Sequence, residues 1–240
     1  MSPSPTFDVR HDESTETLVI GVAQYGLAGL TAVDYLTERT EMERVGHVAA
    51  DGLPPVAPFE AGTPRHHTRL FADASVGMTV LVGELFVPPP AAGVFSEAIF
   101  DSMGEECEEI VVLSGVPTAH GPDDHRAFYI ATEEFQRRRL EDTDIRAMGG
   151  GFLDGINGSI VSRAIDGDTA ACVLTTPVHA QTPDVDAALR LFEALDEIYE
   201  LDVDTGPLEE FAAAVADHYS GLAERVAEEQ GSAGEDLMYM

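Results

Sequence analysis

Segments with the apolar pattern of buried β-strands alternate with amphipathic helices along this chain of 240 residues. Residues 18–23 form an uninterrupted apolar run, which is typical of a strand buried on both faces of a sheet. A turn containing Gly26 and Gly29 follows, and then an amphipathic helix that reaches about Arg39. The succession recurs, with further strands expected near 7–10, 45–50, 68–71, 78–85, 109–113, 128–131, 145–148 and 169–176, and helices near 91–106, 133–140, 156–165 and 184–199. Of these strands, 45–50 is expected in the core, and residues 56–67 are expected as a loop.

This alternation predicts an α/β fold, a three-layer single domain with helices on both faces of a mostly parallel or mixed sheet. Residues 1–16 are polar, and we expect a flexible segment there with at most a short edge strand. The domain is expected over 17–229 and ends in a long helix that begins near Pro207. That helix packs on the domain or forms a subunit contact. Residues 230–240 open with a glycine-rich spacer and are expected as a flexible tail.

The charge of the chain restricts its partners. It has 44 acidic residues against 13 basic ones, all of them Arg, for a net charge of −31. Such a surface repels nucleic acids and anionic membranes, so neither is expected as a partner. The acidic residues are scattered rather than gathered in one tail. This favours adaptation to a salty cytoplasm over a patch that steers an incoming partner.

The sequence also points to a cytoplasmic protein. The N-terminal residues do not have the pattern of a signal peptide, and no apolar run reaches the ~18 residues that a membrane span needs. The two cysteines, Cys107 and Cys172, have no metal-type spacing. We expect both to be free, buried thiols in a reducing compartment.

The glycine-rich turn is a candidate ligand site. A turn at the start of a helix can bind a phosphate, because the first backbone N–H groups of the helix are free to donate. Gly26 and Gly29 could serve such a loop. They could equally serve only the close packing of the helix on the strand, since glycine has no side chain to obstruct it.

Other polar clusters are open to two interpretations. His120, Asp123, Asp124 and His125 could hold a metal or form a solvated loop. The basic residues 65–69 could hold an anion or pair with nearby acids, and Glu84 could be a catalytic carboxylate or a solvated strand end. With no Lys there is no Schiff-base chemistry, and neither a Gly-x-Ser-x-Gly motif nor a lysine-bearing phosphate loop is present. We therefore expect no enzyme, no resident metal and no cofactor.

The last three residues, Met238, Tyr239 and Met240, form a hydrophobic–Tyr–X tripeptide. Such a tail offers an aromatic ring with a hydroxyl group and a terminal carboxylate. Together these fit a pocket with an apolar wall and a cation. An apolar tip after a polar spacer is unusual for a disordered tail, which is normally polar. The tripeptide is therefore a candidate partner-binding site.

Several segments, taken in order, resemble the archaeal proteasome assembly chaperone family. The resemblance covers about residues 17–215. It is carried by Gly-Leu-Ala-Gly at 26–29, Gly-Leu-Pro-Pro at 52–55, Val-Val-Leu-Ser-Gly-Val-Pro-Thr at 111–118, Gly-Phe-Leu-Asp-Gly-Ile-Asn-Gly at 151–158, Pro-Asp-Val-Asp-Ala-Ala at 183–188 and Val-Asp-Thr-Gly-Pro-Leu at 203–208.

This resemblance implies a fold similar to nucleoside phosphorylases, no catalysis, homo-oligomers and binding to the α-subunits of the 20S proteasome. It also implies that Met238, Tyr239 and Met240 are the docking motif. Two alternatives remain. One is an enzyme of nucleoside phosphorylase or carboxylate–amine ligase type, with a phosphate cradle at Gly26 and Gly29 and charge from Arg65 or Arg69. The other is a cap that regulates the mature proteasome.

Overall fold

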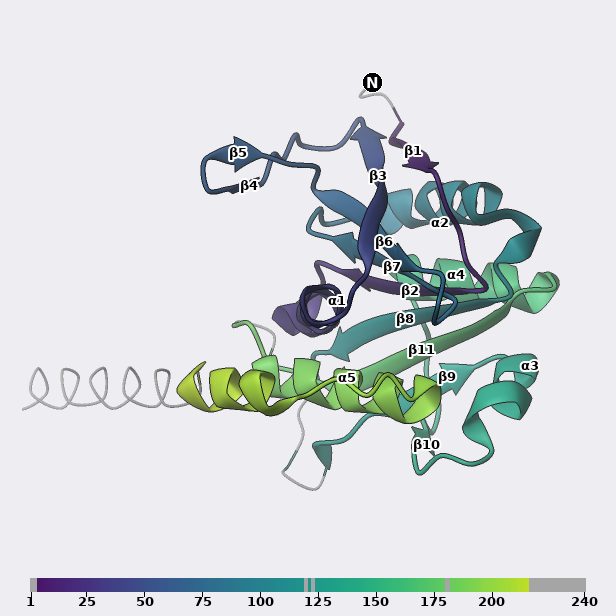
Figure 1. Ribbon diagram of the computed structural model, residues 1–240. Helices are drawn as coiled ribbons and strands as arrows, with labels where there is room; N and C mark the ends of the chain where they lie inside the picture. Colours follow the sequence, from purple (N-terminus) through teal and green to yellow (C-terminus); the bar gives the residue numbers. More distant parts are fainter. Residues whose placement is uncertain (1–3, 119–120, 122–123, 180–181, 216–240) are drawn as a thin grey trace, which may run out of the picture. The chain divides into compact units, whose positions relative to one another are not determined.

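The structure is a computed structural model that describes residues 4–118, 121, 124–179 and 182–215 (Figure 1). Its contacts divide the chain into two units, Met1–Val203 and Asp204–Met240. The first unit holds the sheet and most of the helices. In the described part of the second, residues 206–215 form a helix. The two units are treated separately below.

One sheet of nine strands organises the first unit, in the order β1-β3-β6-β7-β2-β8-β11-β9-β10. Its four central strands are parallel to one another, whereas β1, β3, β6 and β7 form antiparallel pairs at one side. At the other side β9 is antiparallel to β11 and parallel to β10. The strands are β1 (Thr6–His11), β2 (Thr17–Val22), β3 (Glu43–Asp51), β6 (Thr68–Asp73), β7 (Met78–Gly83), β8 (Glu109–Val116), β9 (Phe128–Ala131), β10 (Arg146–Ala147) and β11 (Ala170–Pro177).

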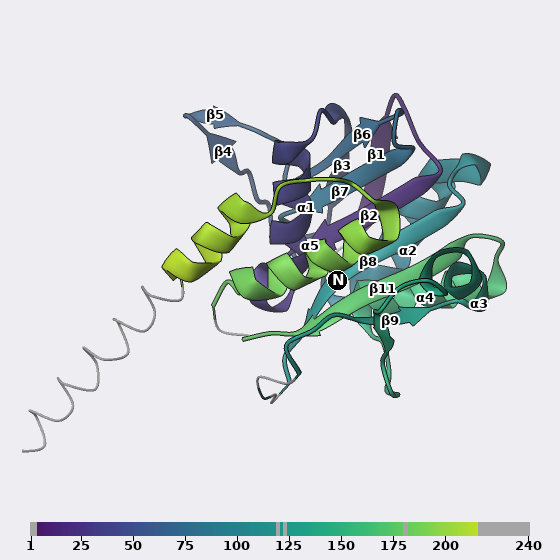
Figure 2. The ribbon, with the colours of Figure 1, turned by 60° about the horizontal axis from the view of Figure 1, so that its bottom comes forward.

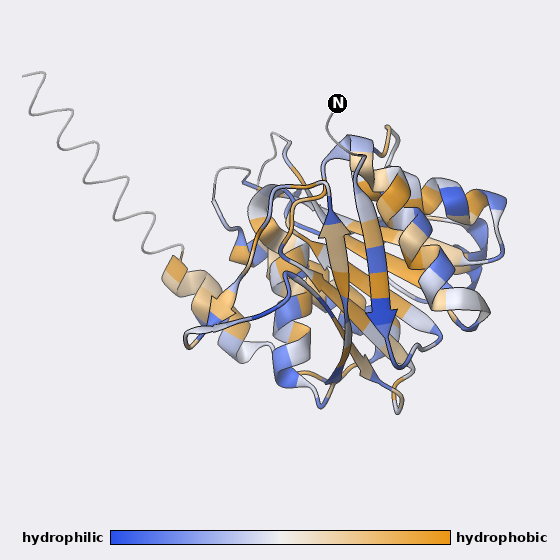
Figure 3. Cartoon of the chain, turned by 90° about the horizontal axis from the view of Figure 1, so that it is seen from above, coloured by the Kyte–Doolittle hydropathy of each residue, from blue (hydrophilic) through white to orange (hydrophobic). Residues whose placement is uncertain are grey.

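The position of each strand in the sheet follows from its pattern of apolar residues. Every residue of β2, β7 and β11 is buried, as expected for strands covered on both faces. Residues of the edge strand β1 alternate between exposed and half-buried. Figure 3 shows this contrast, with hydrophobic colour over the interior strands and hydrophilic bands on the outermost ones.

Helices cover both faces of the central strands, which makes the fold three-layered. On one face α1 (Ala28–Arg39) packs against α5 (Val185–Tyr199), and Tyr35 meets Phe192 edge-on at 5.5 Å (Figure 2). On the other face α2 (Pro89–Met103) packs against α4 (Gly155–Asp166). Their buried side chains, including Phe95 and Ile160, share one apolar core with β2, β8 and β11.

The buried carboxylate of Glu109 ties the amino-terminal end of β8 to two other elements. Glu109 is 3% exposed and accepts hydrogen bonds from Nε of Arg139, at 3.0 and 3.1 Å, and from the hydroxyl of Tyr199, at 3.1 Å. Arg139 lies in a π-helical turn, Gln136–Leu140, that continues α3 (Glu133–Phe135). Burial is the main reason that the pKa of Tyr199 lies well above its ordinary value.

The expected fold class is confirmed, and strands and helices lie close to the expected positions. The short edge strand expected near residues 7–10 is β1. Three details differ. The strand β3 is mostly half-buried rather than a core strand, because it lies one place in from the sheet edge. The loop 56–67 contains a two-stranded hairpin of β4 (Phe59–Glu60) and β5 (Thr63–Pro64). The strand β8 continues past residues 114 and 115 to Val116.

Candidate functional site

The glycine-rich turn is shaped by close packing. Gly26 has a φ of 66°, a left-handed conformation that suits glycine, and lies in a short 3-10 turn, Tyr25–Leu27, before α1. A Cβ atom at Gly29 would lie 2.0 Å from the carbonyl oxygen of Leu113, so α1 crosses β8 in direct backbone contact. A Cβ at Gly26 would lie 2.9 Å from Cβ of Val178. The geometry therefore explains both glycines by packing.

An acidic residue also lies beside this turn. The backbone N–H of Asp184 donates to the carbonyl of Gly26 at 2.8 Å. Its carboxylate caps α5 by accepting from the N–H of Ala187 at 3.0 Å, and it accepts from the backbone N–H and the ring Nδ1 of His179, both at 2.8 Å. Burial alone would raise the pKa of Asp184, but these hydrogen bonds and the charge of His179 hold it below its ordinary value. A carboxylate here disfavours a phosphate at the turn.

The carboxyl ends of β2 and β8 carry polar side chains that bind one another. The amide of Asn157, in the first turn of α4, donates to the hydroxyl of Ser114 at 2.8 Å. That hydroxyl donates in turn to Oε1 of Gln24, also at 2.8 Å. Ligands of open α/β sheets bind at this edge. Ser114 is 2% exposed and its hydroxyl is engaged in both directions, so it is not placed as a nucleophile.

The basic segment at residues 65–69 pairs with nearby acids, which was one of its two interpretations. Arg65 forms a two-pronged ion pair with Glu84, including a hydrogen bond of 2.7 Å from Nη2. The hydrogen bond to Glu84 is the main reason that the pKa of Arg65 is raised. Arg69 reaches Asp34 of α1 at 3.2 Å and lies over the ring of Phe71. Both guanidinium groups proposed for a phosphate cradle are thus engaged elsewhere.

Two other candidate sites fall partly or wholly outside the described residues. Of the possible metal cluster, His120 and Asp123 lie outside them. Among the residues that the structure does describe, no group of three or more His, Cys, Asp and Glu side chains could hold a metal ion. Met238, Tyr239 and Met240 also lie outside the described residues.

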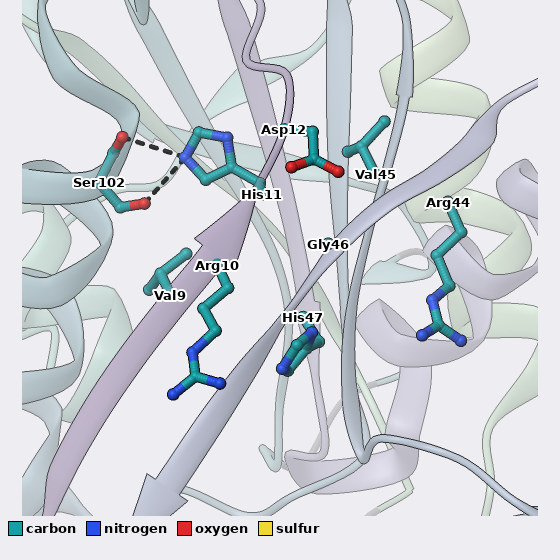
Figure 4. Close-up of a pocket in the computed structure, with 9 residues that line it drawn as sticks. All are labelled: Val9, Arg10, His11, Asp12, Arg44, Val45, Gly46, His47 and Ser102. Carbon is teal, nitrogen blue, oxygen red and sulfur yellow. Dashed lines mark hydrogen bonds between the residues drawn. The ribbon is translucent and has the colours of Figure 1, made fainter.

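The structure reveals a cationic groove that the sequence analysis did not identify (Figure 4). It has a volume of about 630 Å³ and is lined by β1, β3 and Ser102 of α2. Arg10 and His47 lie side by side as register partners, with Arg44 on the same strand as His47. The ring of His47 stacks on that of His66, with centroids 3.7 Å apart.

The lining of this groove carries two arginines, Arg10 and Arg44, against one acidic residue, Asp12, and Arg10 is ion-paired with Asp8. Burial is the first reason that the pKa of His47 is lowered, and the charges of His66, Arg10 and Arg44 lower it further. His11, at the upper end of the groove, holds the backbone of Glu13 with one ring nitrogen and Ser102 with the other, so it is not a free base. Nε2 of His11 lies 2.9 Å from the hydroxyl oxygen of Ser102, but Nδ1 of the same ring bonds a backbone carbonyl, and among the described residues no acidic side chain orients the ring.

Sequence reasoning missed this groove because its residues lie more than 30 positions apart, and only the pairing of β1 with β3 brings them together. The one local signal is in residues 6–11, where charged side chains at positions 8 and 10 alternate with less polar ones.

Comparison with known proteins identifies the family of the chain. The model of the PAC2 family matches residues 18–223. The chain belongs to the PAC2 family. An uncharacterized protein of Methanocaldococcus jannaschii is 22% identical to this PAC2 protein over 201 residues, which cover 83% of this chain and 82% of the relative.

Solved structures share the fold of this PAC2 protein. Pyrococcus furiosus PbaA, described as an archaeal homolog of proteasome-assembly chaperone, aligns with a TM-score of 0.83 at 20% identity and covers 98% of this chain and 100% of its own. PbaB of the same organism, described as an archaeal proteasome activator, aligns with a TM-score of 0.74 at 17% identity over 93% of this chain and 100% of its own.

The family match and the shared fold confirm the resemblance to the archaeal proteasome assembly chaperone family. In the part of the PAC2 chain that the structure describes, no helix is both long and apolar enough to cross a membrane.

Proposed function

We propose that this PAC2 protein assists assembly of the proteasome by binding α-subunits of the 20S particle through Met238, Tyr239 and Met240. The observation that carries the proposal is the family match over residues 18–223; the last three residues lie in the stretch 224–240, beyond that match. The proposal takes Met240 as the carboxyl terminus. It also takes the protein to be a homo-oligomer, because several weak tails on one body bind more tightly than one.

The chemistry of the tail suits this role. A buried Tyr ring supplies apolar area, and its hydroxyl group gives the contact a direction. The carboxylate of Met240 would pair with a cation on the α-subunit, and a charge-assisted hydrogen bond of this kind is worth about 1.5–3 kcal/mol when desolvated. In molar salt the net charge of −31 is screened beyond a few ångströms, so this local contact would dominate.

The polar features of the described structure support a binding protein over the enzyme alternative. Arg65 and Arg69 pair with Glu84 and Asp34, and Gly29 is in contact with the backbone of β8. A phosphate cradle at the turn would need those guanidinium groups free.

A pull-down of α-subunits in molar salt tests the proposal. The full chain should retain them, and three variants should lose them: removal of residues 238–240, Tyr239→Ala, and one extra residue after Met240. All should melt at the parental temperature, because they leave the family-matched region intact. Parental binding by both Tyr239→Ala and the extended chain would move the interface to the folded body.

A second candidate function is a cap on the mature proteasome, favoured by the likeness to PbaB, an archaeal proteasome activator. Peptide hydrolysis by assembled 20S particles separates the two. A cap changes the hydrolysis rate of the finished particle. An assembly chaperone changes only the rate at which subunits form it.

A further inference from the structure

The edge strand β1 leaves a row of backbone groups open. Among the described residues it pairs only with β3. The N–H of Asp12 donates to the carbonyl of Val45 at 3.1 Å, in the same antiparallel register. Because bonding direction alternates along an antiparallel strand, residues 6, 8 and 10 bond to β3, and Phe7, Val9 and His11 direct their N–H and C=O groups outward.

The two faces of β1 differ in chemistry. Asp8 and Arg10 lie on one face with side chains 60% and 64% exposed, and Nε of Arg10 donates to Oδ2 of Asp8 at 2.7 Å. Phe7 and Val9 lie on the other face, half-buried toward α2, where Phe7 meets Phe95 edge-on at 5.2 Å. A strand added at this edge would meet charge on one face and apolar surface on the other.

The charges on β1 are complementary to those of a second β1 strand that runs in the opposite direction, because Asp8 and Arg10 lie on either side of Val9. We propose that β1 pairs antiparallel with β1 of a second copy, with Val9 opposite the partner's Val9. Asp8 then lies opposite the partner's Arg10, and Arg10 opposite the partner's Asp8. Phe7 lies opposite the partner's His11. All the outward-directed backbone groups of residues 7, 9 and 11 gain a partner in this register.

The charges exclude neighbouring registers. A shift by two residues in one direction places Asp8 opposite the partner's Asp8, and in the other direction it places Arg10 opposite the partner's Arg10. A parallel pairing in register also sets like charges side by side. Like charges directly opposite each other are destabilising, so the order Asp-Val-Arg selects one arrangement. Charged side chains usually keep sheet edges apart; here they allow one partner only.

The contact joins the two sheets into one and covers the exposed sides of Phe7 and Val9. It identifies an edge strand, rather than the terminal helix, as a contact between copies. This contact rests on the homo-oligomer in the proposed function and specifies how two copies meet. Its test does not depend on proteasome binding, which the pull-down measures separately.

Charge reversal with rescue tests the register. In sedimentation of the full chain in molar salt, the parent should form a dimer or a larger even-numbered assembly. Asp8→Arg and Arg10→Asp should each raise the dissociation constant about tenfold or more, because each places like charges opposite one another. The double variant restores opposite charges in the same register and should return to near-parental association.

Matched controls carry the same charge changes to exposed positions near the other edge of the sheet. Asp142→Arg and Arg146→Asp should leave association unchanged, and melting curves show that each variant is folded. A monomeric parent, an assembly indifferent to both single reversals, or a double variant that stays dissociated would each overturn the proposal.

Cross-linking tests the contact directly. Val9→Cys places one thiol at the symmetry axis, and mild oxidation should give a covalent dimer in high yield. The native thiols should not interfere, since both are buried and burial raises the pKa of Cys107 to about 11. Val76→Cys, in the exposed turn between β6 and β7, is the matched control and should stay monomeric on a denaturing gel. Equal cross-linking of the two variants would contradict the contact.

Discussion

Gly29 lies where α1 touches β8, and replacing it with Ala tests whether packing explains the glycine-rich turn. The new Cβ would lie 2.0 Å from the carbonyl oxygen of Leu113 and 2.7 Å from its carbonyl carbon. Both atoms belong to the backbone of β8 at a buried residue, so neither can move away as a flexible side chain could. The whole helix must shift from the sheet, or the strand must bend.

The size of the effect follows from two opposing contributions. Overpacking of a well-packed core costs up to about 3 kcal/mol, and an overlap this close belongs at that end. Ala favours a helix over Gly by about 1 kcal/mol. Gly29→Ala should therefore lower the free energy of unfolding by about 2 kcal/mol.

Gly93→Ala is the matched control. Gly93 also lies inside a helix, α2, but an added Cβ there would meet only Oγ of Ser159, at 4.0 Å. With the same gain in helix propensity and no overlap, this variant should be more stable than the parent by about 0.5–1 kcal/mol.

The assay is urea unfolding at a fixed molar salt concentration, followed by circular dichroism, because the chain has no Trp to report by fluorescence. Linear extrapolation gives the free energy of unfolding for each variant. If Gly29→Ala were as stable as the parent, or rose with Gly93→Ala, close approach to β8 would not be what requires glycine at this position.

Three further outcomes are expected. Glu109→Ala should lower the free energy of unfolding by about 2 kcal/mol in the same urea assay, because it leaves the buried hydroxyl of Tyr199 unpaired, whereas Arg139 can turn to solvent; a loss below 1 kcal/mol would contradict that role. The pKa of Asp184 is lowered on folding, so its contribution is complete above the ordinary aspartate pKa of about 3.9 and is lost as the pH falls through the lowered value. The melting temperature of Asp184→Asn should accordingly lie below the parental one at pH 7, and the gap should narrow at low pH; a constant gap would refute this. Phosphate, nucleosides and ATP should leave the parental melting temperature unchanged in high salt, and a clear rise would favour the enzyme alternative.

How well a candidate site can be predicted from the sequence depends on how far apart its residues lie along the chain. The turn at Gly26 and Gly29 can be located from the sequence because its signal is contiguous, but the sequence allows both ligand binding and close packing there. For Arg65 the sequence supports only the general expectation that basic residues in a loop pair with nearby acids, and it does not identify Glu84 as the partner. The cationic groove at Arg10 and His47 could not be found at all, because no local pattern says that β1 and β3 are neighbours.

Local physics determined the order and kind of the elements. Apolar runs predicted β2, β8 and β11. Helical spacing of apolar residues predicted α1 and α5, and Asp184 caps α5 as its sequence indicates. Each of these signals lies within a single element. It shows whether one face or both faces of that element are buried, because this depends on the element's own side chains.

Only the tertiary structure decided which strands are neighbours. The antiparallel side of the sheet places β3 near the edge, although its apolar residues suggest a core strand, and within the described part of the chain one side of β1 has no strand beside it. It also brings Arg10 beside His47. Strand order depends on how helices far apart in the sequence pack on the two faces of the sheet. The apolar pattern of a strand shows that the strand is buried, but it does not show which strands lie beside it.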